Sequence, residues 1–386
     1  MTLHNTTEFA KKGVIGGSIS LGIVLTLFIF FKVGVFVKDI LFPPKIDPAN
    51  QAYGKIPPII FPESTFTDQY TYTIDTVNGS LPEDFPDRLI VYPTIISSPN
   101  LLNLETAKSR VATLGFVDES GNPLPEIPRG GSNFEWEENT GLQRKIVYDI
   151  VTQNFIMSSD YLTSLTVLNA QNLGDEKTAI NTVESFLSGI DSFPPDIDIS
   201  VTQKPTPDMT YATSPQLYSI SDGKLVRTTS LSSTQLIRVD LYQKEVAYTL
   251  TAGQNSNLTR FQDFELVLPI LYPNPPYSTM NFLVASGPND TEVVSGIYNH
   301  QTVNLEPEQQ ATYPIKTAAE AFEELKNNKG YIAAYNAAGN QILIKNVFLA
   351  YYLGDKQQEY MMPIIVFEGQ NGFFAYVSAI KDASLE

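Results

Sequence analysis

The stretch Gly13–Phe31 reads GVIGGSISLGIVLTLFIFF and carries no charged side chain. A helix rises about 1.5 Å per residue, so a helix of this length matches the roughly 30 Å hydrocarbon core of a bilayer. Lys32 interrupts the apolar run and Val33–Val37 resumes it, which places Lys32 near the lipid headgroups. The sequence therefore predicts a single transmembrane anchor over residues 13–37, preceded by a short head, residues 1–12.

A cleaved signal peptide is the alternative interpretation of this stretch. The uncharged run is longer than a usual signal-peptide core, and no small-residue cleavage motif follows before Pro43–Pro44, so a retained anchor is favoured. Lysines flank both ends of the run, so the positive-inside rule does not fix the orientation by itself. We expect a single-pass protein of the cell membrane with a cytoplasmic N-terminus and the body outside. The mirror topology, with a cytoplasmic body, is the alternative.

The chain is acidic and has no cysteine. It contains 42 acidic and 25 basic residues, for a formal net charge of −17 at pH 7. Nucleic-acid phosphates need a basic surface, so this charge argues against nucleic-acid binding. Disulfides, thiol catalysis and thiolate metal sites are excluded by the lack of cysteine. An extracellular eukaryotic body of this length would usually carry disulfides, so the composition favours a prokaryotic envelope protein.

Beyond the anchor, the chain divides into a stalk and a body. Residues 38–62 are rich in proline and are expected to form an extended stalk. The first unit of the body, residues 63–170, combines strand-like runs with a helix that Asn103 would cap. The second unit, residues 171–310, has a helical apolar stripe over 175–190 and then several strand-like runs. This order predicts an α+β fold of two or three antiparallel sheets, each with one packed helix.

The third unit, residues 311–386, has the clearest pattern. Thr317 and Glu320 have the spacing of a capping box, so a helix is expected to begin at Thr317. Three strand-like runs follow between residues 341 and 380, separated by glycine-containing turns. The pattern predicts a helix followed by an antiparallel three-stranded meander.

Residues 312–380 resemble the PepSY-like domains of bacterial envelope proteins. The resemblance lies in the capped helix TAAEAFEEL (317–325), followed by VFLAYY (347–352) and MPIIVF (362–367). The strand positions that match the family pattern are Leu349, Tyr351, Pro363 and Phe367.

One N-terminal span followed by an α+β body is also similar to the YycH and YycI regulators, membrane-anchored proteins that modulate a cell-wall sensor kinase. The resemblance implies a binding or regulatory role with a protein partner in the envelope. It brings no catalytic residue, cofactor or metal to this sequence.

Tyrosine is frequent in the body, with 20 in the whole chain and several in strand-like runs. Tyrosine suits half-buried sheet surfaces, and it is also enriched in protein interfaces. A binding surface for a protein or a sugar is therefore the alternative to core packing. The candidate partner-binding residues are Tyr351, Tyr352, Tyr360 and Tyr376.

Two acid–base patterns have a functional and a structural interpretation. His300 is one of two histidines and a candidate base, although a surface or strand-end histidine is the commoner case. Asp191, Asp196 and Asp198 lie in a proline-rich connector and have oxygen ligands of the kind that calcium prefers. No EF-hand pattern accompanies them, so a solvated acidic loop is favoured and no metal is predicted.

Glu135 and Glu137 flank Trp136, the single tryptophan. Paired carboxylates are the catalytic groups of glycan-cleaving enzymes. On a strand, however, the two glutamates share one face while Trp136 points to the other, which favours a core tryptophan beneath an acidic outer face.

The sequence thus favours a non-enzymatic binding or regulatory protein of the prokaryotic cell envelope, anchored in the bilayer through residues 13–37 and contacting a protein partner. A glycan-acting envelope hydrolase and a structural spacer are the alternatives.

Overall fold

The computed structural model describes residues 48–66, 69–138, 141–170, 173–197, 199, 214–250, 264–275, 277–286 and 291–386. The predicted head and the predicted anchor, residues 13–37, lie outside this part of the chain. Within it, no helix has the length and apolar character needed to cross a bilayer. All of the described residues except Pro48, Leu250 and Phe264 belong to one compact unit.

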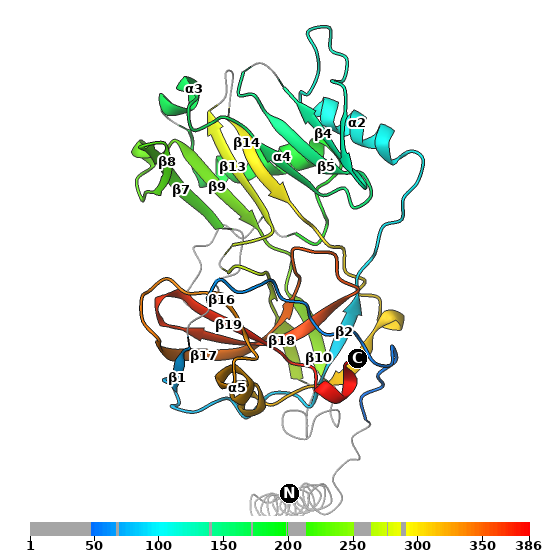
Figure 1. Ribbon diagram of the computed structural model, residues 1–386, viewed down its shortest axis with the longest axis vertical. Coiled ribbons are helices and arrows are strands. Elements are labelled where there is room, and N and C mark those ends of the chain that lie inside the picture. The colour runs from blue at the N-terminus through cyan, green and yellow to red at the C-terminus, as the bar shows by residue number, and fades with distance from the viewer. Residues whose placement is uncertain are drawn as a thin grey trace, which may run out of the picture. The chain divides into compact units, whose positions relative to one another are not determined.

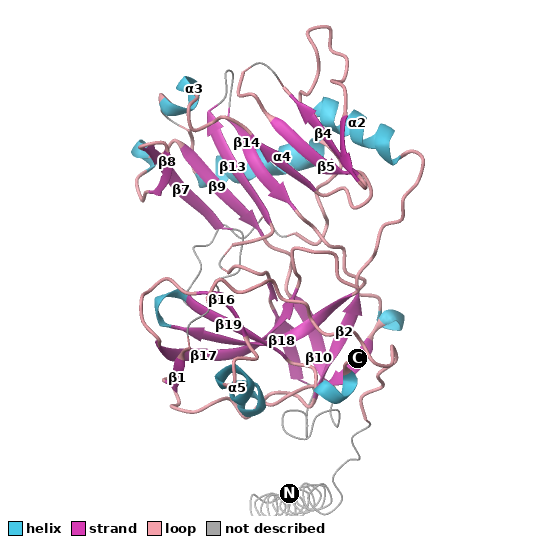
Figure 2. Ribbon diagram, in the orientation of Figure 1, coloured by secondary structure: helices cyan, strands magenta, loops and turns pink. Residues whose placement is uncertain are grey.

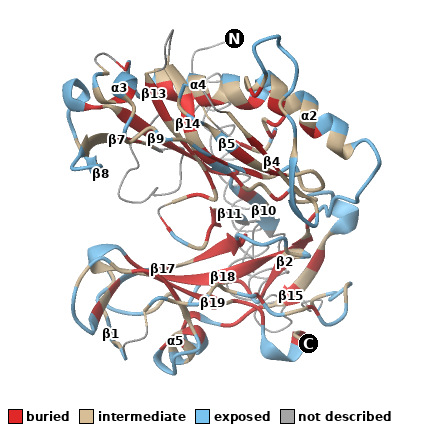
Figure 3. Cartoon of the chain, turned by 45° about the horizontal axis from the view of Figure 1, so that its top comes forward, coloured by how far each residue is buried: buried red, intermediate tan, exposed pale blue. Residues whose placement is uncertain are grey.

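The fold is α+β, as the sequence predicts, with more strand than helix (Figure 1, Figure 2). The strands of the described residues form a nine-stranded sheet, an eight-stranded sheet and the pair β10–β11. Buried residues concentrate on the strands of both large sheets (Figure 3). The described helices are α2 (Asn103–Thr113), α3 (Leu165–Leu168), α4 (Glu176–Gly189) and α5 (Ala318–Lys326).

The nine-stranded sheet has the order β3-β4-β5-β6-β14-β13-β9-β7-β8. Its neighbouring strands all pair antiparallel. The strands are β3 (Ile127–Gly130), β4 (Asn133–Glu137), β5 (Lys145–Asp149), β6 (Phe155–Ser158), β7 (Ser214–Ser221), β8 (Lys224–Arg227), β9 (Leu236–Leu241), β13 (Met280–Ser286) and β14 (Thr291–Tyr298).

Helix α4 covers one face of this sheet. Asp175 caps it, because the carboxylate accepts a hydrogen bond from the Thr178 amide at 2.8 Å. Its predicted apolar stripe is buried, and the ring of Phe186 lies 5.9 Å from that of Phe282 on β13. Gly296 on β14 is opposite Phe282, where any side chain would collide with the ring.

The eight-stranded sheet has a main path, β1-β17-β18-β19-β16. β18 and β19 continue β17 as an antiparallel meander, which confirms that prediction. β2 also pairs with β18 and with β15, and β12 pairs with β17. The strands are β1 (Thr71–Ile74), β2 (Arg88–Pro93), β12 (Ile270–Leu271), β15 (Ala311–Pro314), β16 (Tyr331–Ala334), β17 (Gln341–Tyr352), β18 (Tyr360–Gly369) and β19 (Phe373–Ser378). The separate pair is β10 (Val246–Leu250) and β11 (Phe264–Leu268).

The strand pairing does not follow the expected division of the body into residues 63–170, 171–310 and 311–386. The eight-stranded sheet takes β1 and β2 from the first range, β12 from the second and β15–β19 from the third. The nine-stranded sheet joins strands of the first two ranges. The two large sheets therefore each combine strands from more than one of the expected ranges, because pairing partners lie far apart in the chain and local patterns do not identify them.

The structure describes residues 48–62 of the expected stalk, residues 38–62. Ile56 is fully buried and forms a parallel bridge with Leu385, close to the C-terminus. The ring of Phe61 stacks on Tyr331 with a centroid distance of 5.2 Å. Ile56 and Phe61, at the described end of the stalk, therefore pack against the folded body.

The capping box of α5 gives a stability prediction. The Glu320 amide donates to Thr317 Oγ1 at 3.2 Å, and the Thr317 amide donates to the Glu320 carboxylate at 2.7 Å. We expect Thr317→Ala to lower the free energy of unfolding by about 1 kcal/mol in denaturant titrations. Thr302→Ala, at an exposed position, should change it by less than about 0.5 kcal/mol. Equal effects of the two substitutions would contradict a capping role.

Candidate functional site

The predicted tyrosine surface is largely core. Tyr351, Tyr352 and Tyr376 each have 0% exposed side chains, so these three cannot contact a partner on the folded surface. Tyr351 donates to the Ile90 carbonyl at 2.9 Å, which ties β17 to β2. Tyr360 is the exception, since it is partly exposed and its ring lies 5.0 Å from Tyr53.

The two carboxylates beside Trp136 form ion pairs within the nine-stranded sheet. Trp136 is fully buried, as the strand pattern predicts. Glu135 pairs with Arg129 on β3, and Glu137 pairs with Lys145 on β5 at 2.7 Å. These are ion pairs between neighbouring strands, and neither glutamate lines the pocket described below.

His300 follows the end of β14 by two residues, consistent with the strand-end histidine that the sequence favours, and it is partly buried and paired with an acid. Its Nε2 lies 3.0 Å from Asp196 Oδ1, and its ring stacks on Tyr298. Gln243 donates to Asp196 Oδ2 at 2.7 Å. Burial would raise the pKa of the Asp196 carboxyl group, but the hydrogen bond and charge of His300 and the Gln243 bond oppose this and hold the pKa below its ordinary value.

The calcium interpretation of Asp191, Asp196 and Asp198 gains no support from the described residues. Both carboxylate oxygens of Asp196 are already bonded, to His300 and Gln243. Asp191 is exposed in the turn after α4, and Asp198 lies outside the described residues. In the part of the chain that the structure describes, no group of three histidine or acidic side chains is placed to hold a metal.

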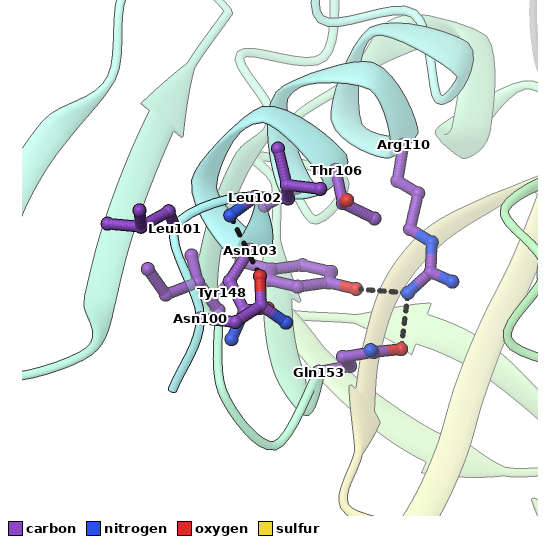
Figure 4. A pocket seen from close by; sticks show the side chains of 10 residues that line it. Asn100, Leu101, Leu102, Asn103, Thr106, Arg110, Tyr148 and Gln153 are labelled. Carbon is purple, nitrogen blue, oxygen red and sulfur yellow. Dashed lines mark hydrogen bonds between the residues drawn. The ribbon is translucent and has the colours of Figure 1, made fainter. Parts of the chain in front are cut away.

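A pocket of about 630 Å³ lies beside α2, where the helix faces the turn between β5 and β6 (Figure 4). Its volume falls in the range of small-molecule sites. None of its lining residues is acidic. The lining residues are Asn100, Leu101, Leu102, Asn103, Thr106, Ala107, Arg110, Tyr148, Ile150 and Gln153.

One end of this pocket is apolar and exposed. Leu101 and Leu102 have exposed fractions of 99% and 71%. They lie in a turn before α2, which Asn100 holds by accepting the Leu102 amide at 2.8 Å. The predicted cap, Asn103, is the first residue of α2, the N-cap position is Leu102, and no side chain makes a capping bond to this helix.

The other end of the pocket is cationic. Nη1 of Arg110 donates to the Tyr148 hydroxyl at 3.3 Å and to the Gln153 side chain (Figure 4). Both partners are neutral, whereas Arg129, Arg144 and Arg238 each pair with a carboxylate. The pocket therefore holds a guanidinium whose charge no lining residue compensates.

Gln153 has a costly backbone conformation. Its φ is +64°, in the left-handed region that glycine and asparagine adopt most readily. Asp149 fixes the turn by accepting the Val151 amide at 2.8 Å and the Thr152 amide at 3.1 Å. The strain is retained at the position whose side chain reaches Arg110, a pattern that is typical of functional sites.

The strain at Gln153 gives a prediction with a matched control. Gln143 also has positive φ, +50°, and is exposed outside the pocket. Since asparagine tolerates this conformation, we expect Gln153→Asn and Gln143→Asn each to raise the free energy of unfolding by about 0.5 kcal/mol. Denaturant titrations measure both, and a loss of more than 1 kcal/mol at Gln153 alone would show that its side chain is needed for folding.

The pH dependence of stability should depend on Asp196. The pKa of the Asp196 carboxyl group is lower in the folded state than in the unfolded state. Its contribution to the free energy of unfolding is therefore complete above the unfolded pKa of about 3.9, and it is lost as the pH falls through the folded pKa. Melting temperatures between pH 6 and pH 3 should fall less steeply in Asp196→Asn than in the wild type. Asp222→Asn, in an exposed turn, should keep the wild-type slope. Identical slopes in all three proteins would contradict this role.

Comparisons with known proteins give no family for this chain. No protein-family model matches it, and no curated protein matches it. Among solved structures, it is similar to the crystal structure of an uncharacterized protein from Eubacterium rectale, with 11% identity and a TM-score of 0.34. That similarity covers 82% of this chain and 90% of the other, and a TM-score this low supports no conclusion about fold or function.

Proposed function

We propose that the chain is a membrane-anchored, extracytoplasmic binding or regulatory protein of the prokaryotic cell envelope, without enzymatic activity. Residues 13–37 would form the anchor, with the N-terminus in the cytoplasm. The pocket beside α2 would be the contact site for a protein partner. The observation that carries the proposal is this pocket, in which exposed leucines lie beside a cation that has only neutral partners.

The ion pairing of the acidic residues favours a binding role over glycan hydrolysis. A glycan-cleaving enzyme needs two carboxylates facing one cleft, about 5 to 10 Å apart. Glu135 and Glu137 are each held by a basic partner on a neighbouring strand, and the pocket lining contains no acid. The pocket beside α2 combines exposed leucines with a cation that has neutral partners, and these are features of a binding site.

The resemblance to PepSY-like domains remains part of the proposal. The order of α5, β17, β18 and β19 agrees with a capped helix followed by a meander. β1, β2 and β12 also belong to this sheet, so a PepSY-like unit would be embedded in a larger sheet and not a separate domain.

In-cell photo-crosslinking tests the binding role. A photo-crosslinking amino acid would replace Leu101 at the pocket, or Val77, which is equally exposed in a turn of the other sheet. In cells of the source organism, we expect a discrete protein adduct from position 101 that is several-fold stronger than from position 77. Adding Gln153→Asn should weaken the adduct, whereas Gln143→Asn should not. Equal adducts at both positions would contradict the proposed site.

Protease protection in the same cells tests the topology. External protease should cleave the body of intact spheroplasts if it lies outside the membrane. Protection until the membrane is broken would place the body in the cytoplasm, and the envelope role would then be wrong.

A further inference from the structure

We infer that the pocket beside α2 recognises the carboxyl end of an apolar peptide segment, with the carboxylate on Arg110 and the apolar side chains against Leu101 and Leu102. This inference rests on the proposed binding role and names the ligand class of that site. It is carried by the hydrogen bonds of Arg110, the character of the lining and the length of α2 along the pocket.

The hydrogen bonds of Arg110 leave one edge of its guanidinium available. A guanidinium has five N–H groups, of which two are on Nη1. Nη1 donates to Tyr148 and Gln153, while the hydrogens on Nε and Nη2 have no partner among the described residues. These two nitrogens form the fork that binds a carboxylate through two parallel hydrogen bonds. The two neutral partners of Nη1 fix the orientation of the fork without neutralising its charge.

The charge of the chain explains why a carboxylate alone would bind poorly. The net charge of −17 repels small anions over long range. This repulsion is screened beyond about 8 Å at physiological salt, so a ligand already held by apolar contacts can place a carboxylate on Arg110. The exposed leucines supply those contacts. The site therefore requires both parts of the ligand.

The lining favours a peptide over a fatty acid, which also joins a carboxylate to an apolar chain. Asn100, Asn103, Thr106 and Gln153 place amide and hydroxyl groups along the pocket. A peptide backbone offers a donor and an acceptor at each residue, whereas a hydrocarbon chain offers neither. Burying such polar groups against hydrocarbon would cost free energy.

The length of α2 between Leu102 and Arg110, which both line the pocket, sets the size of the ligand. Arg110 follows Leu102 by eight positions along α2, which corresponds to about 12 Å at 1.5 Å per residue. An extended peptide covers about 3.3 Å per residue. A segment of about four residues therefore reaches from the guanidinium to the leucines.

Peptide binding to the full chain in lipid nanodiscs tests the inference. The probes are a dye-labelled Ala-Leu-Ala-Leu peptide with a free carboxyl end and the same peptide ending in a carboxamide. By fluorescence anisotropy, we expect the carboxamide to bind about tenfold more weakly, since a hydrogen-bonded charge is lost. Arg110→Gln should remove this difference, and the exposed Arg227→Gln should keep it. Circular dichroism melting confirms that each variant is folded, and Gln153→Asn, which releases Arg110 from one partner, provides a second variant that should reduce the difference.

The outcomes separate the ligand from the binding role. Equal binding of the two peptides, no binding of either, or an unaffected Arg110→Gln variant would overturn the carboxylate assignment. Displacement of the peptide by laurate at lower concentrations than by unlabelled peptide would assign the pocket to lipid and overturn the peptide class. If crosslinking from position 101 still captured a specific partner in those cases, the proposed function would stand and only the ligand class would be wrong.

Discussion

The eight-stranded sheet depends on β17, a strand of 12 residues that three other strands pair with. β18 runs antiparallel along one edge, while β1 and β12 occupy the two ends of the other edge, both parallel to β17. Parallel pairs need long crossover connections. The connection from β1 to β17 is long because it contains the whole nine-stranded sheet, whose strands lie within residues 127–298, between β2 and β15 in the chain. One sheet is therefore built inside the connections of the other.

Local elements could be predicted from the sequence, because their signals lie within short continuous stretches of the chain. The capping box at Thr317, the apolar stripe of α4 and the meander after α5 all lie within such short windows. The strand partners within the two large sheets could not be predicted, for the opposite reason. Gln341 pairs with Thr71, although most of the sequence of the body lies between them. Neither short strand carries a pattern that identifies the other as its partner. Strand partners are chosen by the whole core, so their register is not a local property.

The tyrosines show how a composition can be misread. Tyr351 and Tyr352 are neighbours on one strand, so their side chains point to opposite faces of the sheet. Both are fully buried, which requires that both faces of β17 are covered there. The uninterrupted apolar run VFLAYY is typical of such a strand, since a half-exposed strand would alternate with polar residues. That continuity was the signal that places these rings in the core.

The candidate site was not predicted from the sequence, because its residues are unfavourable for the local structure at their positions. A turn that only connects two sheets would gain solubility from polar residues at Leu101 and Leu102, and a turn at Gln153 would be less strained with glycine. Rules for reading a sequence assume that the residue at each position suits its local structure, so they do not identify positions where the residue is locally unfavourable. Here these positions converge on one 630 Å³ pocket around Arg110, although they come from separate segments. Each kind of departure also stands alone elsewhere, as the exposed Val77 and the positive φ of Gln143 show, so the pocket is distinguished by their meeting around one cation with neutral partners.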